Sequence, residues 1–573
     1  MSIVPEKDTR TTKSIELLLV LSWLAGSIGA YFLTSFFSNF YPLPYQFVLL
    51  SLLFQWLCGT AIFLFSNEPT SKSPPKQHTE PLATLTLFVA FALSVAAVVI
   101  SWQFPGLFNR RILFMELPRL PLFILLLSIS LGAFILLFKF TRLNVFFERF
   151  KQPRFFNFTQ VNVPGILLAM FFLFTYLIFA ETINFPGFRT LDQFFDTDIS
   201  EWLDRLTSTT LEDASIVRAV HPAVLLFLRP LVWMISILLN GDRLQAVLLL
   251  NALAGASCVM LTWLIVKRAS GNTTYSLIFA SLLGASASHL LLSSMLETYI
   301  YSALALLLFV FLIQNGHTSL KFTVPAGVLV FGITITNLIQ TCILYVFNYP
   351  RLKVIIKYVL MVLLITAALN LLQVWIYPNA RSVFQPSNFE REGYYIWDPF
   401  DLSWQTLGRY SLIARAVPLY GVVAPTPFVL REELAVEYPN FRTYQILLGE
   451  FHVAPYRGLA DVTVKVWIVI LAVAGILFIL NLFKDPKQVM LPLSLALCLG
   501  FSLVLHMVYG DDPMLYSPNW VYALILFVAL MLQRWADRRW LQVFLMAFLV
   551  LLINTNLKLI YQIMDVSLPY FGK

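Results

Sequence analysis

Two aspartates in a polar stretch, FFDTDISEWLDRL, are the first residues whose types and spacing could do chemistry. Asp196 and Asp198 lie two residues apart, and carboxylates so placed could accept the proton of a hydroxyl that becomes a nucleophile. They could also ligate a divalent cation, Mg²⁺ or Mn²⁺, through their oxygens. A third interpretation is structural, because Asp is a common N-cap and a helix is expected to begin near Ser200. The spacing leaves all three roles open.

Positive charge follows in RAVHP at 218–222 and in the apolar segment after it. His221-Pro222 opens that segment, Arg218 precedes it, and Arg229 comes one or two turns later. A helix N-terminus near cations suits an anionic group, so these three residues are candidate phosphate ligands. The alternative is an ordinary interfacial helix with Pro in its first turn and an arginine that reaches to the surface.

Two further polar groups interrupt apolar sequence and are candidate substrate contacts. Glu297 follows SSML and precedes an unbroken apolar run, and HMVYGDDPMLYSPN at 506–519 contains His506 and Tyr516. An ionisable residue at the end of a span can also be a simple interfacial cap. Tyrosine in a turn between spans is common for amphipathic reasons alone.

These residues sit in a chain that is too apolar for water. Of its 573 residues 59% are hydrophobic and only 12% are Asp, Glu, Lys or Arg, whereas a soluble domain carries about 25% charged residues. This composition excludes an ordinary soluble enzyme, a disordered protein and a nucleic-acid binder. It predicts an all-α polytopic membrane protein whose surroundings are membrane lipids. The net charge of +8 then marks topology, since basic residues stay on the cytoplasmic side.

The apolar runs predict a bundle of about 13–15 transmembrane helices, because a span needs about 20 apolar residues. Two half-length segments, 322–336 and 337–349, meet at Thr336-Asn337. The full spans are expected at 16–37, 43–66, 82–103, 119–139, 161–181, 244–266, 274–293, 297–314, 355–377, 459–483, 490–508, 514–533 and 540–561.

The basic residues between Lys139 and Arg154 place that loop and the N-terminus in the cytoplasm. The acidic loop 182–220 is then external, and 221–241 is expected to lie along the outer surface as an interfacial helix, or to re-enter the membrane from that side. This divides the chain into accessory helices at 1–160, a module at 161–377, an external region at 378–458 and C-terminal helices at 459–573. All three polar patches fall on the outer face, which predicts a single site.

The order of these motifs resembles the membrane glycosyltransferases of the GT-C superfamily, and most closely the group of protein O-mannosyltransferases and lipid A aminoarabinose transferases. The segments that carry the resemblance are FFDTDISEWLDRL, VHPAVLLFLRPL, NGDRLQAVLLLNALAGASCVMLTWLIVKRASG, HLLLSSMLETYIYSALALLLF and HMVYGDDPMLYSPNW. They cover about 160–315 and resume near the C-terminus. Each motif is degenerate, but their order is more specific.

The resemblance implies a GT-C-like bundle that transfers a sugar, with inversion, from a polyprenyl- or dolichyl-phosphate donor. The acceptor would be a hydroxyl of a glycan, lipid or protein on the non-cytoplasmic face, and the expected location is a bacterial inner membrane with the site facing the periplasm. The family's loop carboxylate corresponds to Asp196 or Asp198, and its HPP-type motif to His221-Pro222, where this chain has Ala223 as the next residue. A divalent cation could also take part in the transfer reaction.

Two other functions stay open from the sequence. A transporter or flippase of a lipid-linked glycan would need polar sites near mid-membrane, whereas here the polar residues collect at one face. A polymerase or ligase of the O-antigen type would use a pyrophosphate-linked donor. The arginines of the external region 378–458 keep this second alternative open.

Overall fold

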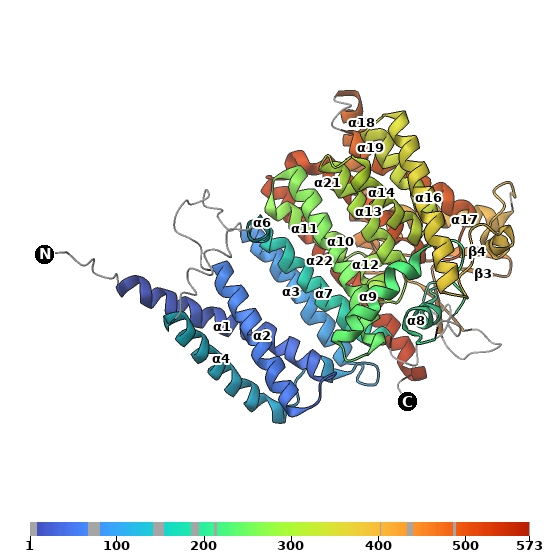
Figure 1. Cartoon of the computed structure of the whole chain (residues 1–573). Helices are drawn as coiled ribbons and strands as arrows, with labels where there is room; N and C mark the ends of the chain where they lie inside the picture. Colours follow the sequence, from blue (N-terminus) through green and yellow to red (C-terminus); the bar gives the residue numbers. More distant parts are fainter. Residues whose placement is uncertain are drawn as a thin grey trace. The chain divides into compact units, whose positions relative to one another are not determined.

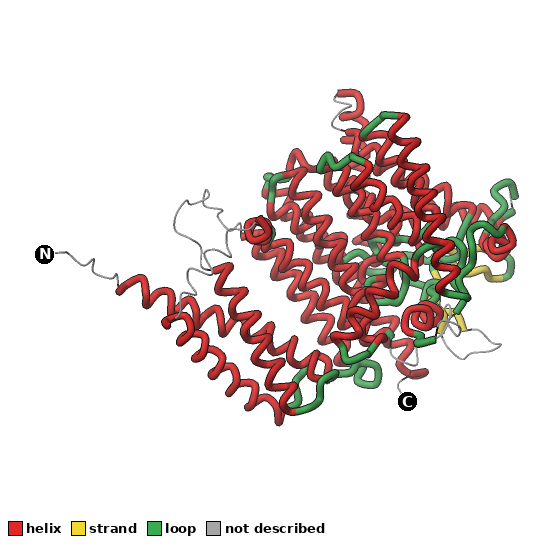
Figure 2. The backbone as a smooth tube through the Cα atoms, in the orientation of Figure 1, coloured by secondary structure: helices red, strands yellow, loops and turns green. Residues whose placement is uncertain are grey.

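Helices dominate the computed structural model, and the strands are short and few (Figure 2). The structure describes residues 9–66, 81–140, 154–184, 194–210, 215–401, 403–431, 439–484 and 489–571. Ten helices of this described part are long and apolar enough to cross a membrane, so the chain is an integral multi-pass membrane protein. They are α1 (Thr9–Ser38), α2 (Pro44–Ser66), α3 (Pro81–Trp102), α4 (Leu120–Phe140), α7 (Val163–Ile183), α10 (Arg243–Ser270), α16 (Leu352–Ile376), α18 (Leu459–Lys484), α19 (Met490–Val508) and α22 (Arg539–Phe571).

Shorter apolar helices complete the set that hydropathy predicts. They are α9 (Val224–Leu238), α11 (Thr273–Gly284), α12 (Ala287–Leu292), α13 (Tyr299–Gln314), α14 (Leu320–Ile333), α15 (Leu338–Asn348) and α21 (Pro518–Leu532). The single span expected at 274–293 is wrong, because the Ser286 side chain accepts from the His289 amide and begins a second helix. The predicted pair of half-length segments is confirmed as α14 and α15, which the 3₁₀ turn η4 (Ile335–Asn337) separates.

The chain forms two compact units. The first comprises residues 1–78, 109–163 and 238–242, with α1, α2, α4 and the short α6 (Arg154–Val161). Within it the centroid of the Trp23 indole lies 4.5 Å from that of the Phe134 ring, with the planes tilted by 38°. The indole N–H donates to Ser130 Oγ at 3.0 Å, a partner that lipid could not supply. The four N-terminal spans that the sequence groups together are divided, since α3 belongs to the second unit.

Several stretches used for the predicted topology lie outside the described residues. Residues 141–153 contain most of the basic cluster that orients the chain, and 185–193 and 211–214 belong to the acidic loop. The orientation of the protein in its membrane therefore stays a prediction.

The second unit has its core where α10, α11, α13 and α21 run side by side (Figure 1). Every residue of α21 is buried, as expected for a helix that is apolar all round. Small residues let the backbones approach closely: a Cβ at Gly255 of α10 would lie 2.2 Å from Ser293 Oγ. Such packing replaces the hydrophobic effect as the force between membrane helices.

Region 378–458, between α16 and α18, holds the few strands. Strands β1 (Phe428–Arg431) and β2 (Pro439–Arg442) pair antiparallel, as do β3 (Tyr444–Leu447) and β4 (Glu450–Val453). Leu448 and Gly449 both have positive φ, which is the geometry of a two-residue hairpin turn. The region also contains η5 (Pro386–Tyr395), α17 (Trp404–Arg415) and the π-helical turn η6 (Ala416–Tyr420). The prediction of a helical membrane protein is confirmed, with these two hairpins as the exception.

Candidate functional site

The structure brings together the three polar patches that the sequence places on one face. The backbone amide of Asp198 donates to Glu297 Oε1 at 2.6 Å, which joins the first patch to the second. Arg218 donates to the Tyr509 hydroxyl at 3.1 Å, which joins the first patch to the third. The rings of Tyr299 and Tyr516 meet edge to face at 5.2 Å. Residues 99 to 291 positions apart therefore form one cluster.

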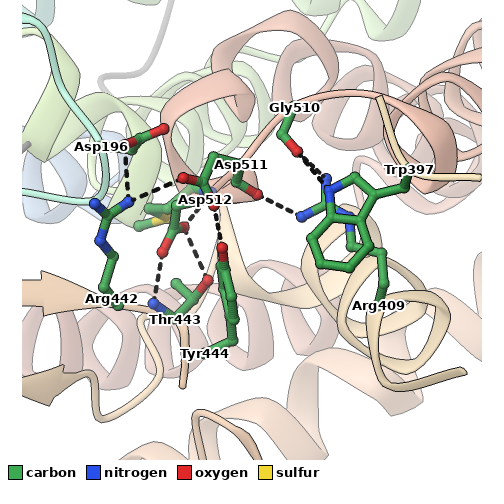
Figure 3. Close-up of polar contacts among 10 residues, drawn as sticks. Asp196, Trp397, Arg409, Arg442, Thr443, Tyr444, Gly510, Asp511 and Asp512 are labelled. Atoms are coloured by element: carbon green, nitrogen blue, oxygen red, sulfur yellow. Dashed lines mark hydrogen bonds and ion pairs between the residues drawn. The ribbon is translucent and has the colours of Figure 1, made fainter. Parts of the chain in front are cut away.

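A tight turn presents Asp196. Phe195 and Asp196 have φ values of 55° and 68°, and left-handed backbone costs about 1–2 kcal/mol per L-residue. The Thr197 amide closes the turn on the Phe194 carbonyl, and the Phe195 amide donates to the Phe441 carbonyl at 2.8 Å. The strained backbone is thus held by β2, and it directs the carboxylate toward Arg442 (Figure 3).

Arg442 lies between two carboxylates from distant parts of the chain. Its Nη1 is 2.8 Å from Asp196 Oδ1 and 3.6 Å from Asp511 Oδ2 (Figure 3). Burial lowers the pKa of Arg442, but the charges of Asp196, Asp511 and Asp512 outweigh burial and raise it. The guanidinium therefore stays charged and ties the Asp196 turn to the acidic turn 509–512.

That acidic turn is held by Thr443 and Tyr444 of region 378–458. Asp512 is fully buried and accepts from the Thr443 amide at 2.6 Å, the Thr443 hydroxyl at 2.8 Å and the Met514 amide at 3.0 Å. It thereby caps the short helix α20 (Pro513–Tyr516). Tyr444 donates its hydroxyl to Asp511 (Figure 3). These two aspartates hold the fold of the site together.

Asp198 and Glu297 have a different environment. Asp198 occupies the N-cap position of α8 (Ile199–Thr207), but its side chain makes no capping hydrogen bond. Glu297 is 3% exposed and accepts from the backbone amides of Asp198 and Thr298. Burial and the nearby Asp198 charge raise the pKa of Glu297. Asp196, Asp198 and Glu297 all lie outside the linings of the two cavities described below. Both oxygens of Glu297 are used by backbone amides, so it positions the Asp198 loop.

A polar cavity of about 350 Å³ lies beside this cluster. Four of the residues predicted from sequence line it: Arg218, His221, His506 and Tyr516. It is also lined by Glu392, Tyr299, Tyr509 and three amides, Asn337, Gln340 and Asn519. The sequence marks Asn337 only as the junction of two half-length segments and Asn519 only as the end of the 506–519 patch, and no local pattern marks Glu392 or Gln340.

Arg218 is paired inside this cavity. Its Nε donates to Glu392 Oε1 at 2.9 Å, and its Nη2 bonds the other carboxylate oxygen. The Tyr509 hydroxyl donates to the same carboxylate, and the guanidinium lies 4.7 Å from the Tyr395 ring centroid. Burial raises the pKa of Glu392, but the hydrogen bonds and charge of Arg218 outweigh this and lower it. The cavity wall therefore carries one cation and one anion.

His221 is a neutral ring in this structure. Its Nδ1 lies 2.6 Å from the Ile333 carbonyl, which can only accept, so Nδ1 carries the hydrogen. Burial lowers the pKa of His221 to about 4, and the charge of Arg218 adds to this effect. An imidazole in this state offers a lone pair at Nε2 and no positive charge. We therefore do not keep it as a phosphate ligand.

His221 should make folding stability depend on pH. The unfolded ring takes up a proton near pH 6.5, whereas the folded ring does so only near pH 4. Stability is thus full above pH 6.5 and falls between 6.5 and 4, by up to about 3 kcal/mol. The midpoint of thermal unfolding at pH 7.5 and at pH 5 should differ less in His221→Gln than in the wild type. Equal differences in the two proteins would contradict this.

Arg229 lies apart from the cavity. It donates to the Ser208 carbonyl and its guanidinium is 5.2 Å from the Tyr377 ring centroid. Arg243 donates to the same carbonyl at 2.6 Å. Two cations at the C-terminal end of α8 complement the helix dipole. Of the three predicted phosphate ligands, only Arg218 is a cation that faces the cavity.

An apolar cavity of about 460 Å³ adjoins the polar one. The two share Ile335, Thr336 and Phe389 in their linings. The apolar cavity is otherwise lined by Pro222, Phe331, Leu363, Thr366, Ala367, Val383 and Phe384. It lies against α14 and α16, so a chain of hydrocarbon could reach the polar groups from the side of the bundle.

The described residues do not form an evident metal centre. They contain no group of three or more His, Cys, Asp or Glu residues that could hold a metal ion. The Asp196 carboxylate is bound by the cationic Arg442, whereas a divalent cation prefers six or more oxygen ligands. The residues present do not fit a divalent ion, and we derive no step through one.

Arg409 is the most completely engaged arginine near the site. It is fully buried, and its guanidinium donates to the carbonyls of His506, Tyr509, Gly510 and Asp511. The His506 carbonyl lies in the last turn of α19 and the other three lie in the turn that follows. Figure 3 shows the bonds to Gly510 and Asp511. The sequence pattern that indicates burial of Arg409 is its helical spacing from the other buried residues of α17, Thr406, Leu412 and Ile413.

The chain was compared with family models, with curated proteins and with solved structures, and none of them matches it.

Proposed function

We propose that this protein is an inverting glycosyltransferase that moves a sugar from a polyprenyl-phosphate donor to an acceptor hydroxyl on the outer face of its membrane. The observation that carries the proposal is the pair of adjoining cavities, one polar and one apolar. A polyprenyl-phosphate sugar has the same two halves. The prenyl chain would occupy the apolar cavity, and the sugar phosphate would occupy the polar one.

The charges of the site suit a phosphate leaving group. Phosphate departs without a general acid, so the site has to supply a cation for the phosphate and a base for the acceptor hydroxyl. Arg218 is the cation in the cavity wall. In the transfer, the acceptor oxygen bonds to the anomeric carbon from the side opposite the phosphate, the carbon–oxygen bond to phosphate breaks, and the base takes the hydroxyl proton.

Asp196 is the better candidate for the base. Asp196 lines neither cavity, but Arg442 ties it to Asp511, in the turn that carries the cavity residue Tyr509. Asp198 instead contributes its amide and its charge to the buried Glu297. The turn with two left-handed residues also fixes Asp196 and not Asp198, and strained backbone tends to be kept where a site needs it.

The position of the arginines favours a monophosphate over a pyrophosphate donor. The Arg409 guanidinium is hydrogen-bonded to backbone carbonyls, and the Arg442 guanidinium forms ion pairs with two carboxylates. Among the described residues that line the two cavities, Arg218 is the one arginine or lysine. One cation suits one phosphate group, so the proposal does not extend to a pyrophosphate-linked donor.

Replacement of each aspartate by asparagine, one at a time, tests the proposal. Asp196→Asn should lower transfer by about a hundredfold or more, the usual value of a positioned base, whereas Asp198→Asn should keep most of the activity. The measurement is release of polyprenyl phosphate from a labelled polyprenyl-phosphate sugar, in membranes that contain the cell's own acceptors.

Asp461→Asn is a matched control, because Asp461 is a partly exposed residue of α18 that pairs with Lys465. It should behave as the wild type does. Full transfer by both Asp196→Asn and Asp198→Asn would overturn the assignment of the base. No release by the wild type from any such donor would overturn the function.

A further inference from the structure

The helix break between α14 and α15 forms one end of the polar cavity. Three amides meet there: Asn337 at the end of η4, Gln340 in α15 and Asn519 at the start of α21. All three are at least 95% buried, with exposed fractions of 2%, 1% and 5%, and all three line the cavity. Buried amides need hydrogen-bond partners, so an amide atom without a partner at this end of the cavity is one that a ligand could bond.

One backbone carbonyl fixes how Gln340 is turned. Gln340 Nε2 lies 3.1 Å from the Asn519 carbonyl oxygen, which can only accept. The nitrogen must therefore face it, and its second hydrogen is donated to Asn337 Oδ1 at 3.0 Å. The Gln340 oxygen is occupied by the Tyr522 hydroxyl at 2.8 Å.

The orientation of Gln340 also determines how the other two amides are turned. Because Asn337 turns its oxygen to Gln340, its nitrogen donates to Ser302 Oγ at 2.8 Å and to Asn519 Oδ1 at 2.9 Å. The side-chain oxygen of Asn519 is thereby used. Its amide nitrogen is left over, and within the described residues it has no hydrogen-bond partner. A preset donor with two hydrogens thus faces the cavity.

The neighbouring groups are uncharged and can both donate and accept. Tyr299 and Tyr516 line the same cavity, and the His506 ring lies 4.7 Å from the Tyr516 ring. His506 Nδ1 is 3.2 Å from the Tyr509 carbonyl, so its Nε2 keeps a lone pair. The ionised side chains of this lining, Arg218 and Glu392, bond to each other. A ligand here meets amide, hydroxyl and imidazole groups and aromatic rings.

We propose that the helix break is a subsite for an uncharged sugar ring, one of whose hydroxyls accepts from the Asn519 amide nitrogen. The inference rests on the proposed function and adds the class of sugar. A donor nitrogen cannot bind an ammonium group, and a charged sugar would be buried there without a counter-ion. The subsite therefore selects a neutral sugar over an amino sugar, and Gln340 and Asn337 act as positioning residues.

The test measures binding of three probes to the full-length protein in lipid nanodiscs. The probes are polyprenyl phosphate, polyprenyl-phosphate hexose and polyprenyl-phosphate 4-amino-4-deoxypentose. The wild type should bind the hexose lipid about tenfold more tightly than the bare lipid, as expected for one or two hydrogen bonds to a sugar. It should bind the amino sugar lipid no better than the bare lipid.

Variants separate the subsite from the phosphate site. Asn519→Leu should lose the preference for hexose and keep the affinity for bare polyprenyl phosphate, and Asn519→Asp should shift the preference toward the amino sugar. Gln340→Met should weaken the preference, because Asn519 is then free to turn. Tyr522→Phe should keep it, since the Asn519 carbonyl still orients Gln340. Gln103→Glu, on an exposed loop residue, is the control for an added carboxylate.

The outcomes distinguish this inference from the function on which it rests. If the wild type binds the bare and the hexose lipid equally, or prefers the amino sugar, the neutral subsite is overturned while phosphate binding stands. If the wild type binds none of the three lipids, the proposed function itself is overturned. A loss of hexose preference in Tyr522→Phe equal to that in Gln340→Met would overturn the positioning roles. Thermal midpoints show that each variant is folded.

Discussion

Replacing Arg409 by Met should destabilise the acidic turn by about 2–5 kcal/mol, because each buried carbonyl left without a donor costs about 1–3 kcal/mol. The guanidinium serves four backbone carbonyls at the end of α19. Methionine fills the space but donates nothing, so the His506 and Asp511 carbonyls lose their side-chain donor. The Tyr509 and Gly510 carbonyls keep only His506 Nδ1 and Trp397 Nε1. The midpoint of thermal unfolding should fall by several degrees, and transfer should be lost because Tyr509 and Asp511 no longer hold their positions.

Two comparisons make this prediction specific. Arg409→Lys should recover only part of the loss, because an ammonium cannot reproduce the planar fork that reaches several carbonyls at once. Arg381→Met, at an exposed arginine of region 378–458, should leave the free energy of unfolding within about 0.5 kcal/mol of the wild type. A midpoint for Arg409→Met that equals that of Arg381→Met would show that the carbonyls find other partners.

The sequence predicts the helices well because a membrane imposes one strong rule. An apolar run must satisfy its own backbone as a helix, so the expected spans at 459–483 and 490–508 agree with α18 and α19 to within one residue. The prediction at 274–293 fails at Ser286, where a local cap competes with the continuing helix. Hydropathy averages over a window and cannot register a single capping hydroxyl.

The candidate site is predictable in part. Arg218, His221, His506 and Tyr516 are polar groups in apolar surroundings, and that scarcity is visible in the sequence. Their partners are not visible in this way. Glu392 follows Arg218 by 174 positions, and nothing near either residue reports the pairing. Arg442 is one arginine among several in the external region, and only the fold places it between Asp196 and Asp511.

The same limit explains the roles that need revision. Glu297 is expected to contact substrate because it is an isolated acid, but its oxygens accept from two backbone amides. His221 is expected to carry charge near a phosphate, but a carbonyl fixes its tautomer and burial keeps it neutral. Residue type identifies a group that can do chemistry. The hydrogen bonds around it decide which chemistry remains available.

Variants of Arg218 and Glu392 should show that the thermal stability of the protein and its binding of polyprenyl phosphate can be changed separately. Arg218→Met leaves Glu392, which is 6% exposed, as a buried carboxylate with only the Tyr509 hydroxyl, and should cost about 3–5 kcal/mol. Arg218→Met combined with Glu392→Gln removes both charges and should return the thermal midpoint to within about 1 kcal/mol of the wild type. Neither variant should bind polyprenyl phosphate measurably, because both lack the cation.

Glu392→Gln alone should have the opposite effect on binding. Arg218 keeps its charge but loses the carboxylate that occupies its fork, so polyprenyl phosphate should bind about tenfold more tightly. In the wild type, the stability contributed by this pair is full above the ordinary carboxyl pKa of 4.5 and is lost as the pH falls through the lowered folded value. Glu392→Gln should lack that acid-dependent loss. Weaker binding by Glu392→Gln would mean that Glu392 orients Arg218 for phosphate and does not compete with it.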